Sequence, residues 1–556
     1  MKALYKKLAI QNLTKNRTVY IPYIMAQTLM VALFYDLLFL EGNKKILYLP
    51  GGETIQQTLA YGGLLMGVFV MIFLFYVNSV LIKQRKKEFG LYRVLGMEHR
   101  HLKKVIFYET SIANAVSFVL GIISGIVFSG LMYMILLKIL GEKAALAFGI
   151  SGEAIWYTLL QFGFLFLVVL LYNYRQLKKV NLRELLQEHA QGDREPKTKK
   201  GLMIFGIICL IIGYGIALVV RNIFASLIWF FVAAIFVIIG TYALFTAGSI
   251  IFLKKIKEDK EKYYTPRYFT AVSGLLHRMK RNAAGLAGIC ILSTMILVTC
   301  AMSVSVFFGQ QHAIRTIFPS DIIVTMSGTS DPQQDIEYIK GQAEKAAQQT
   351  GISVKEVKLS DLSEVEKSMT LVEGTQNVQI ELSGSDEEKY ECSTRLELNT
   401  EDGSYTYQSA HFISKQSPQE GAQSIRATYG GFLFLGIFLG AMFMVATVLM
   451  IYYKQISEGY EDRQRYVIMK KVGMNDEEVR ESIQTQVLLV FFLPLVMAAV
   501  HILAALKIMV QICGILSIGF GTVFLCTIGT VLVFSLIYKG VYKQTAKVYY
   551  TIVDQQ

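Results

Sequence analysis

Charged residues are scarce in this sequence of 556 residues. Asp, Glu, Lys and Arg make up 17% of it and hydrophobic residues 53%, a balance that soluble globular domains rarely have. Most of the chain must therefore face lipid rather than water. A helix needs about 20 apolar residues to cross the hydrocarbon core, and ten stretches qualify, at residues 20–40, 58–82, 111–138, 154–174, 202–220, 225–253, 284–308, 431–453, 487–506 and 517–538.

Cysteines and catalytic motifs are also scarce. Of the six cysteines, four fall inside predicted spans, Cys513 lies between spans nine and ten, and Cys392 stands alone between spans seven and eight. No internal disulfide can therefore join the segment that holds Cys392, and packing roles are favoured for the others. No Cys/His cluster has zinc spacing, no Ser-His-Asp arrangement can be argued, and no G-x-x-x-x-G-K-[ST] loop could cradle nucleotide phosphates. We expect no catalytic site, metal or cofactor in this chain.

The basic residues indicate how the spans are oriented, because Lys and Arg accumulate in short loops on the cytoplasmic side. They fill the loops at residues 83–104, 175–200 and 254–281, and they precede the first span as Lys2, Lys6, Lys7, Lys15 and Arg17. All of these positions lie inside if ten spans leave both termini in the cytoplasm. The stretch before the first span is too long for a cleaved signal peptide, so we expect that span to be retained.

One segment carries the opposite charge. Residues 331–427 hold 18 acidic and 9 basic side chains, a net charge of −9 that leaves +22 for the rest of the chain. We therefore predict a small extracellular domain at residues 309–428. Residues 377–382 and 395–400 are predicted as strands and residues 331–349 as a helix, which makes an α+β unit.

An internal repeat relates two segments at a constant offset of 377 residues. Residues 85–109 align with residues 462–486, and the matched residues include Gly96 with Gly473, Arg93 with Lys470, Leu102 with Val479, Ile106 with Ile483, and Glu109 with Gln486. Each copy predicts a short helix across the cytoplasmic surface, a glycine C-cap, and a second helix that rises into the membrane. Asn475 and Glu478 resemble a capping box for the second start. A weaker repeat links residues 8–17 with residues 270–282.

The predicted fold is an all-α polytopic membrane protein of about ten transmembrane helices, arranged 4+2+4, with a small α+β extracellular domain between helices seven and eight. The predicted parts are a cytoplasmic amphipathic lead helix (1–19), helices one to four (20–174), a cytoplasmic linker (175–200), helices five and six (201–253), a second lead helix (254–283), helix seven (284–308), the extracellular domain (309–428), and helices eight to ten with a cytoplasmic tail (429–556).

Two repeated surface segments favour a paired partner on the cytoplasmic side. The alternative is that they are ordinary basic loops that bind anionic lipid headgroups. That alternative accounts for residues 83–87, but the second copy is acidic and includes Asp462, Glu477, Glu478 and Glu481, which such lipids would repel. We therefore favour docking of a protein partner.

Three strings carry a resemblance to a known family: NSVLIKQRKKEFGLYRVLGM at residues 78–97, IYYKQISEGYEDRQRYVIMKKVGM at residues 451–474 and TAKVYYTIV at residues 545–553. They resemble the FtsX/MacB-type permeases of ABC transporters, and more narrowly the Bce-type permeases that give Gram-positive bacteria resistance to bacitracin, lantibiotics and other antimicrobial peptides. The resemblance covers nearly the whole chain outside the predicted extracellular domain.

The resemblance implies a plasma-membrane permease that pairs with a separate ATPase, on which ATP and Mg²⁺ would be bound. It also implies that the substrate is a peptide antibiotic or its lipid-linked cell-wall target, and that a membrane sensor histidine kinase is a further partner. No nucleic acid is expected. Carried over to this sequence, the residues that couple to the ATPase are Glu88, Phe89, Gly90, Leu91, Tyr92, Arg93, Gly96, Arg465, Tyr466, Met469, Lys470 and Gly473.

Polar residues within spans are costly and often functional. Asp36 is expected near the outer end of span one, close enough to water to reach it, and is a candidate substrate contact. His501 is either a proton relay or, as we favour, a residue satisfied by a neighbouring helix. Glu109 is expected to form a salt bridge with the basic loop before it.

Two pairs of glycines have the G-x-x-x-G spacing that lets helix backbones approach closely. They are Gly121 with Gly125, and Gly436 with Gly440. Both pairs can pack within the chain, and the second pair is also a candidate contact for a membrane partner.

Two functions are compatible with these patterns. The first is a permease that protects the cell by expelling a peptide or releasing it from its target. The alternative is an ATP-driven mechanotransmission or signalling platform that regulates an extracellular hydrolase or a kinase without handling a drug.

Overall fold

The computed structural model describes most of the chain. The residues outside the description are 1, 50, 143–148, 179–198, 260–265, 318–322, 328–355, 360–365, 374–375, 384–392, 398–411, 417, 472, 474, 515, 517 and 555–556. The chain forms two compact units, a helical one (Met1–Lys44, Gln56–Val306 and Gly431–Gln556) and a second one (Lys45–Ile55 and Phe307–Gly430).

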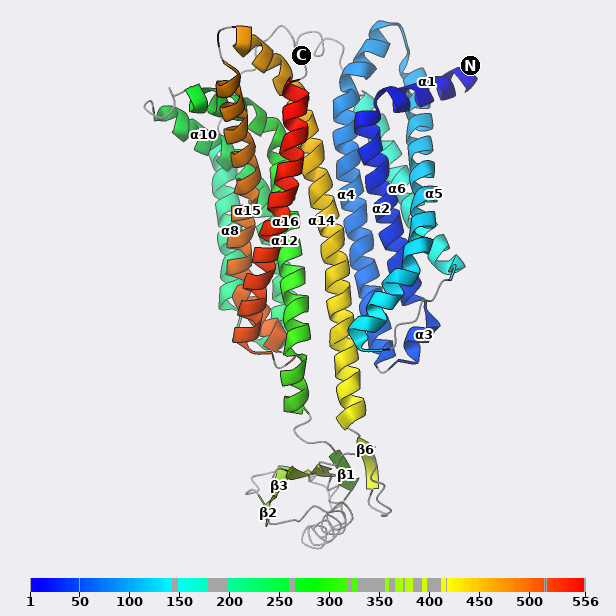
Figure 1. Cartoon of the computed structure of the whole chain (residues 1–556), viewed down its shortest axis with the longest axis vertical. Coiled ribbons are helices and arrows are strands. Elements are labelled where there is room, and N and C mark those ends of the chain that lie inside the picture. The colour runs from blue at the N-terminus through cyan, green and yellow to red at the C-terminus, as the bar shows by residue number, and fades with distance from the viewer. Residues whose placement is uncertain are drawn as a thin grey trace. The chain divides into compact units, whose positions relative to one another are not determined.

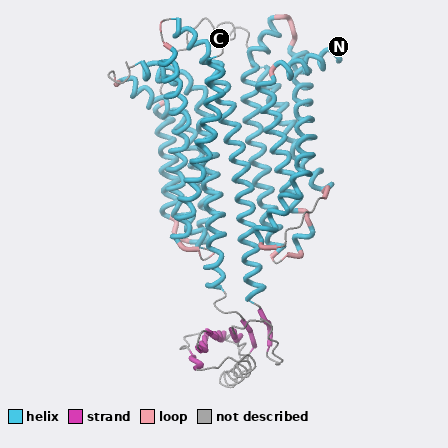
Figure 2. Tube along the Cα trace, in the orientation of Figure 1, coloured by secondary structure: helices cyan, strands magenta, loops and turns pink. Residues whose placement is uncertain are grey.

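Within the described residues, ten helices are long and apolar enough to cross a membrane. Each of them overlaps one of the ten predicted spans, so the multi-pass helical architecture is confirmed. Figures 1 and 2 show these helices side by side, with the strands confined to the segment between α12 and α14.

The first half contains α1 to α6. Their bounds are Lys2–Lys15 for α1, Arg17–Glu41 for α2, Lys44–Leu47 for α3, Gly52–Val94 for α4, His99–Leu140 for α5 and Gly152–Lys178 for α6. The linker pair consists of α8 (Lys200–Val219), α9 (Ile223–Ala243), a π-helical turn η1 (Leu244–Gly248) and α10 (Ser249–Glu258). The second half contains α12 (Pro266–Ile317), α14 (Pro418–Lys471), α15 (Asp476–Gly514) and α16 (Phe520–Asp554).

The structure corrects the predicted boundaries of the surface helices. The repeated segments are not separate short helices, because α4 continues without a break from its span to Val94 and α14 continues to Lys471. The second lead helix likewise merges with span seven into α12. At a rise of 1.5 Å per residue, the 54 residues of α14 extend over about 80 Å, far more than the roughly 30 Å of a hydrocarbon core.

Small residues bring α5 against α2 in the first half. A Cβ added at Gly121 would lie 2.5 Å from Cβ of Val31, and one added at Gly125 would lie 2.7 Å from the ring of Tyr35. Ser117 donates to the backbone oxygen of Ile24 at 3.3 Å on the same face. The G-x-x-x-G pair of α5 therefore packs within the chain.

The two halves meet along α4 and α14. The rings of Phe69 and Phe443 pack edge to face with centroids 4.7 Å apart, and a Cβ at Gly62 would clash with the Leu435 side chain. Nearer the ends that carry the repeat, the buried Tyr453 donates from its hydroxyl to the backbone oxygen of Val19 in α2, at 3.4 Å. These contacts place the two repeated helices in one helical unit.

The linker pair packs on α15 through His501, which is 3% exposed. Thr241 donates its hydroxyl proton to the backbone oxygen of Val237, so its oxygen accepts from Nε2 of His501 at 3.0 Å. Nδ1 of His501 then accepts from the hydroxyl of Tyr214 at 2.6 Å. Both ring nitrogens are satisfied by neighbouring helices, which agrees with the favoured structural role rather than a proton relay.

Six strands form one antiparallel sheet in the second unit. They are β1 (Ile323–Ser327), β2 (Glu356–Leu359), β3 (Glu366–Glu373), β4 (Gln376–Ser383), β5 (Ser393–Glu397) and β6 (Phe412–Gln416). The strand order is β2-β3-β4-β5-β1-β6. The strand predicted at residues 377–382 is confirmed by β4 and the strand at 395–400 partly by β5, while the helix predicted at 331–349 and Cys392 lie outside the described residues.

We predict that Gly121→Ala destabilises the helical unit by about 1 to 3 kcal/mol, because the new methyl group overpacks against Val31 and the backbone of α2. Thermal unfolding of the purified protein in detergent measures this. Gly163→Ala in α6 is the matched control, since its methyl group meets nothing within 4 Å and alanine is the better helix former. Equal stability of the two variants would contradict this packing.

Candidate functional site: two equivalent helix ends

The first repeated segment ends α4 in a left-handed turn. Gly96 has φ of 87°, a conformation that glycine adopts without steric cost. Its N–H donates to the backbone oxygen of Arg93 at 3.1 Å, and the N–H of Met97 donates to that of Tyr92 at 3.0 Å. This pair of bonds is a Schellman motif, and α5 starts two residues later at His99.

The second repeated segment ends α14 in the same way. Gly473 has φ of 107°, and its N–H donates to the backbone oxygen of Lys470 at 3.2 Å. The next helix, α15, begins at Asp476, which puts Asn475 at the N-cap position expected for the capping box. The repeat in sequence is thus a repeat in backbone geometry.

Burial repeats as well. Phe89 and its counterpart Tyr466 are both 2% exposed, whereas Leu91 and its counterpart Ile468 are 59% and 62% exposed. The inward residues of the following helices are buried in both copies, namely Leu102, Ile106, Val479 and Ile483. Each helix end therefore anchors one aromatic ring inside the protein and exposes an aliphatic side chain at an equivalent position. Further aliphatic side chains are exposed nearby, namely Val94, Leu95 and Val467.

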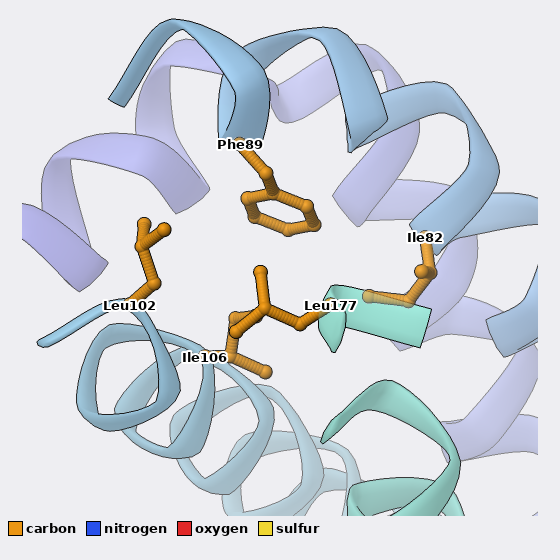
Figure 3. Close-up of a cluster of buried hydrophobic side chains, with 5 residues drawn as sticks. All are labelled: Ile82, Phe89, Leu102, Ile106 and Leu177. Atoms are coloured by element: carbon orange, nitrogen blue, oxygen red, sulfur yellow. The ribbon is translucent and has the colours of Figure 1, made fainter. Parts of the chain in front are cut away.

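The anchor of the first end is a compact apolar cluster (Figure 3). Phe89 points into a group formed with Ile82 of α4, Leu102 and Ile106 of α5, and Leu177 of α6. Tyr92, Met97 and Tyr174 pack around it. The cluster fixes the end of α4 against the start of α5 and the end of α6, so these three helices move together at this end.

A buried ion pair lies beside this cluster. Arg85 donates from Nη2 to Oε1 of Glu109 at 3.2 Å and makes a second bond from Nη1 to Oε2. Both side chains are almost completely buried. The hydroxyl of Tyr20 accepts from Arg85 at 2.5 Å and donates to Glu109 at 3.2 Å. This confirms the salt bridge predicted for Glu109 and links α4, α5 and α2.

The environment of Arg85 keeps it charged. Burial alone would lower the pKa of Arg85, but the interactions with Tyr20 and Glu109 raise the pKa above its usual value. The guanidinium group also lies over the ring of Phe89, 4.9 Å from the centroid, a favourable cation–π arrangement. The buried arginine therefore has partners on both its polar edge and its flat face.

The N-terminal helix α1 completes this network. Asn12 donates to Oε1 of Glu109 at 2.6 Å and accepts from the hydroxyl of Tyr92 at 2.9 Å. Asn16, between α1 and α2, donates to Glu88 at 3.1 Å, and Glu88 also pairs with Arg85 at 3.1 Å. Two of the predicted coupling residues, Glu88 and Tyr92, are thus held by the residues that precede the first span.

The remaining predicted residues occupy different positions. Gly90 is buried, and Arg93, Met469 and Lys470 are half-buried. The side chain of Arg465 lies outside the description. The roles of these residues in coupling stay predictions.

The candidate contacts within the spans are placed as follows. Asp36 is 1% exposed, so it does not reach water as expected, and its role in substrate contact stays a prediction. A Cβ at Gly436 would lie within 2.2 Å of the Ser303 side chain and one at Gly440 would lie 2.4 Å from Sγ of Cys300. These glycines therefore pack against α12 within the chain.

Sequence analysis missed the network around Arg85. It assigned Arg85 to a basic loop compatible with anionic lipids and gave no role to Asn12, Asn16 or Tyr20. One signal was available, because Arg85 and Glu88 are spaced for an ion pair on one helix face. The participation of α1 and α2 depends on tertiary packing and left no local pattern.

Comparison with known proteins supports the class of protein that the sequence resembles, the FtsX-type permeases of ABC transporters. Residues 62–182 match the family described as FtsX-like permease C-terminal, a range that includes the first helix end. The chain is 23% identical to the bacitracin export permease protein BceB of Halalkalibacterium halodurans, over 90% of this chain and 92% of that protein. It is 24% identical to the ABC transporter permease protein YxdM of Bacillus subtilis, over 94% of this chain and 97% of that one.

Two other relatives match over a shorter range. The chain is 26% identical to the ABC transporter permease YvcS of Bacillus subtilis over 57% of its length, and 27% identical to the BceB protein of the same organism over 57%. These alignments span about half the length of each relative, 49% and 50%.

The ten apolar helices among the described residues and the two equivalent helix ends define a multi-pass membrane protein with an internally repeated helical body. More narrowly, residues 62–182 form an FtsX-like permease domain, and the chain is homologous to ABC transporter permeases that include the bacitracin export permeases. Membership of the ABC permease class implies that the partner is an ABC ATPase.

We predict that Arg85→Met and Glu109→Gln each destabilise the protein by roughly 3 kcal/mol, because each leaves a polar partner buried without its counterpart. The stability lost in the double variant should be smaller than the sum of the losses in the two single variants. Thermal unfolding in detergent measures the three values.

The pair Arg100 and Glu98 provides the control. Its side chains are 73% and 59% exposed, and exposed ion pairs contribute about 1 kcal/mol or less. Arg100→Met should therefore change stability little. Additive losses at Arg85 and Glu109 would show that the two residues do not act as a pair.

Proposed function

We propose that this chain is the permease subunit of an ABC system that handles cell-wall-targeting antimicrobial peptides, with both termini in the cytoplasm. The observation that carries the proposal is the pair of equivalent helix ends at Gly96 and Gly473. Both ends have a left-handed glycine turn and a buried aromatic side chain, and both expose an aliphatic side chain at the equivalent position, Leu91 or Ile468. ATP hydrolysis is assigned to a separate subunit.

The chemistry of the two helix ends supports docking of the ATPase. In this proposal the end at Gly96 is the first docking end and the end at Gly473 is the second. Both ends lie beyond the apolar spans, which finish at Ile82 in α4 and at Ile456 in α14. An exposed large aliphatic residue next to a basic one is typical of a protein interface, where an apolar centre has a polar rim. In both copies an exposed aliphatic residue, Leu91 or Ile468, is followed two residues later in the helix by a half-buried basic residue, Arg93 or Lys470.

The continuity of the helices supports mechanical coupling. α14 begins at Pro418, directly after the strand β6, and ends at Lys471, beside the second docking end. Because its backbone hydrogen bonds run without a break, a movement at one end displaces the other. α12, which precedes β1, is the other long helix next to the strand-containing segment. In this proposal the ATPase moves the second docking end, and α14 carries that movement across the membrane to the extracellular domain.

The class of substrate is proposed from the relatives and from charge. Two of the relatives are described as bacitracin export permeases. Residues 331–427 carry a net charge of −9, and such a field raises the local concentration of cationic molecules. A peptide antibiotic or its lipid-linked target is therefore the proposed cargo, and a sensor kinase is a proposed further partner.

We predict that Leu91→Asp and Ile468→Asp each reduce co-purification of the cognate ATPase roughly tenfold or more, because each removes the apolar centre of a docking end. The charge reversals Arg93→Glu and Lys470→Glu should reduce it in the same direction. Affinity purification of the complex from membranes measures the yield. Leu47→Asp in α3, which changes an exposed leucine just before the start of α4 and so at the opposite end of that helix from Leu91, is the matched control. Wild-type yield in all four docking variants would rule out these ends as the ATPase site.

We also predict that deletion of the gene sensitises the cell to at least one cell-wall-targeting peptide. Minimum inhibitory concentrations across a broad peptide panel measure this, with complementation by the Leu91→Asp variant as a control that should fail. Unchanged sensitivity across the panel, together with a cell-wall hydrolase that co-purifies with the extracellular domain, would instead establish the mechanotransmission alternative.

A further inference from the structure

The C-terminal segment of the chain has no role in the function proposed above. Its sequence TAKVYYTIV at residues 545–553 is distinctive, and most of it lies beyond the apolar span of α16, which finishes at Lys547. The segment continues the same helix to Asp554. Thr545, Ala546 and Tyr549 are buried, so one face of it is covered by protein.

The covering element is the last part of α14. The hydroxyl of Tyr549 donates to Oδ2 of Asp462, and both residues are buried, at 1% and 2% exposure. One turn earlier in α14, a Cβ added at Gly459 would lie 3.2 Å from Cγ2 of Ile552. Glycine at this position is therefore what lets the C-terminal segment approach α14 closely.

These contacts occur where the first half uses different groups. By the offset of the repeat, Asp462 corresponds to Arg85 and Gly459 corresponds to Ile82. In the first half, Arg85 is held by Tyr20 and Glu109, and Ile82 packs against Leu177 at the end of α6. The same two positions are thus braced in both halves, by an ion pair and α6 in one and by the C-terminal segment in the other.

We propose that the C-terminal segment from Thr545 is the brace of the second docking end, and that Tyr549 is a positioning residue acting through Asp462. The C-terminal segment holds the part of α14 between Gly459 and Lys471 in a fixed position. Ile468 and Lys470 can then contact the ATPase at the same time as Leu91 and Arg93. This inference rests on the proposed function for its consequence in coupling, but the brace itself is a property of the permease alone.

The first experiment uses the purified full-length permease without any ATPase. Hydrogen–deuterium exchange is compared at residues 459–471 and, as an internal reference, at residues 85–94. Tyr549→Phe removes only the hydroxyl that binds Asp462, and we expect exchange at residues 459–471 to accelerate roughly tenfold, as befits the loss of one hydrogen bond to a charged group. Exchange at residues 85–94 should not change.

A pair of compensating substitutions at Gly459 and Ile552 tests the packing contact. It also distinguishes a positioning role of the C-terminal segment from a general loss of structure. Gly459→Ala should accelerate exchange at residues 459–471, because the added methyl group meets Ile552. Adding Ile552→Ala to Gly459→Ala should return exchange toward the wild-type rate. Gly540→Ala, in the same helix as Ile552 but with nothing within 4 Å of its Cβ, and Tyr542→Phe, whose ring packs on Phe491, are the matched controls.

The second experiment repeats the variants in the presence of the ATPase. Tyr549→Phe and Gly459→Ala should lower the yield of the complex and the hydrolysis rate in it, and the double variant at Gly459 and Ile552 should recover both. Unchanged exchange at residues 459–471 in Tyr549→Phe and Gly459→Ala would overturn the brace. If exchange changes as expected but the wild-type permease captures no ATPase, then the brace stands and the proposed function fails.

Discussion

The ion pair between Arg85 and Glu109 is the interaction on which the position of the first helix end, at Gly96, depends. It is buried, and its Coulomb attraction offsets the cost of taking both charges out of water only because further groups satisfy them. Those groups come from α1 and α2, through Asn12 and Tyr20. One interaction therefore fixes the positions of four helices, and with them the orientation in which Leu91 and Arg93 are presented.

The second helix end, at Gly473, reaches the same geometry through different chemistry. Gly473 and the buried Tyr466 reproduce Gly96 and Phe89, but the residue that matches Arg85 is Asp462, bonded to Tyr549. A repeated permease body needs equal backbone positions at its two ends, and burial of an aromatic anchor provides these in both copies. The polar brace beside the anchor is free to differ, provided that every buried charge has a partner. The chain uses residues near its N-terminus at one end and residues near its C-terminus at the other.

Sequence patterns predicted the parts of this protein that depend on local composition. Ten apolar stretches predicted the ten long apolar helices found in the described part of the chain, and the strand at residues 377–382 followed from its alternating Val378, Ile380 and Leu382. The repeat predicted glycine turns at Gly96 and Gly473 because a left-handed C-cap favours one residue type. The predicted short surface helices were wrong, because nothing in the sequence between the spans and these glycines breaks a helix. Asp36 was expected near water, whereas it is buried, since burial depends on neighbours from other helices.

By itself, the sequence determined the membrane-spanning class, the apolar spans and the positions of the two repeated helix ends, because lipid imposes a length and an apolar composition that can be read along the chain. Only the tertiary structure decided what holds those ends in place. Asn12 and Glu109 are far apart in sequence, as are Asp462 and Tyr549. A hydrogen bond between distant segments leaves no periodicity in either of them, so it becomes visible only when the helices that carry them are packed together.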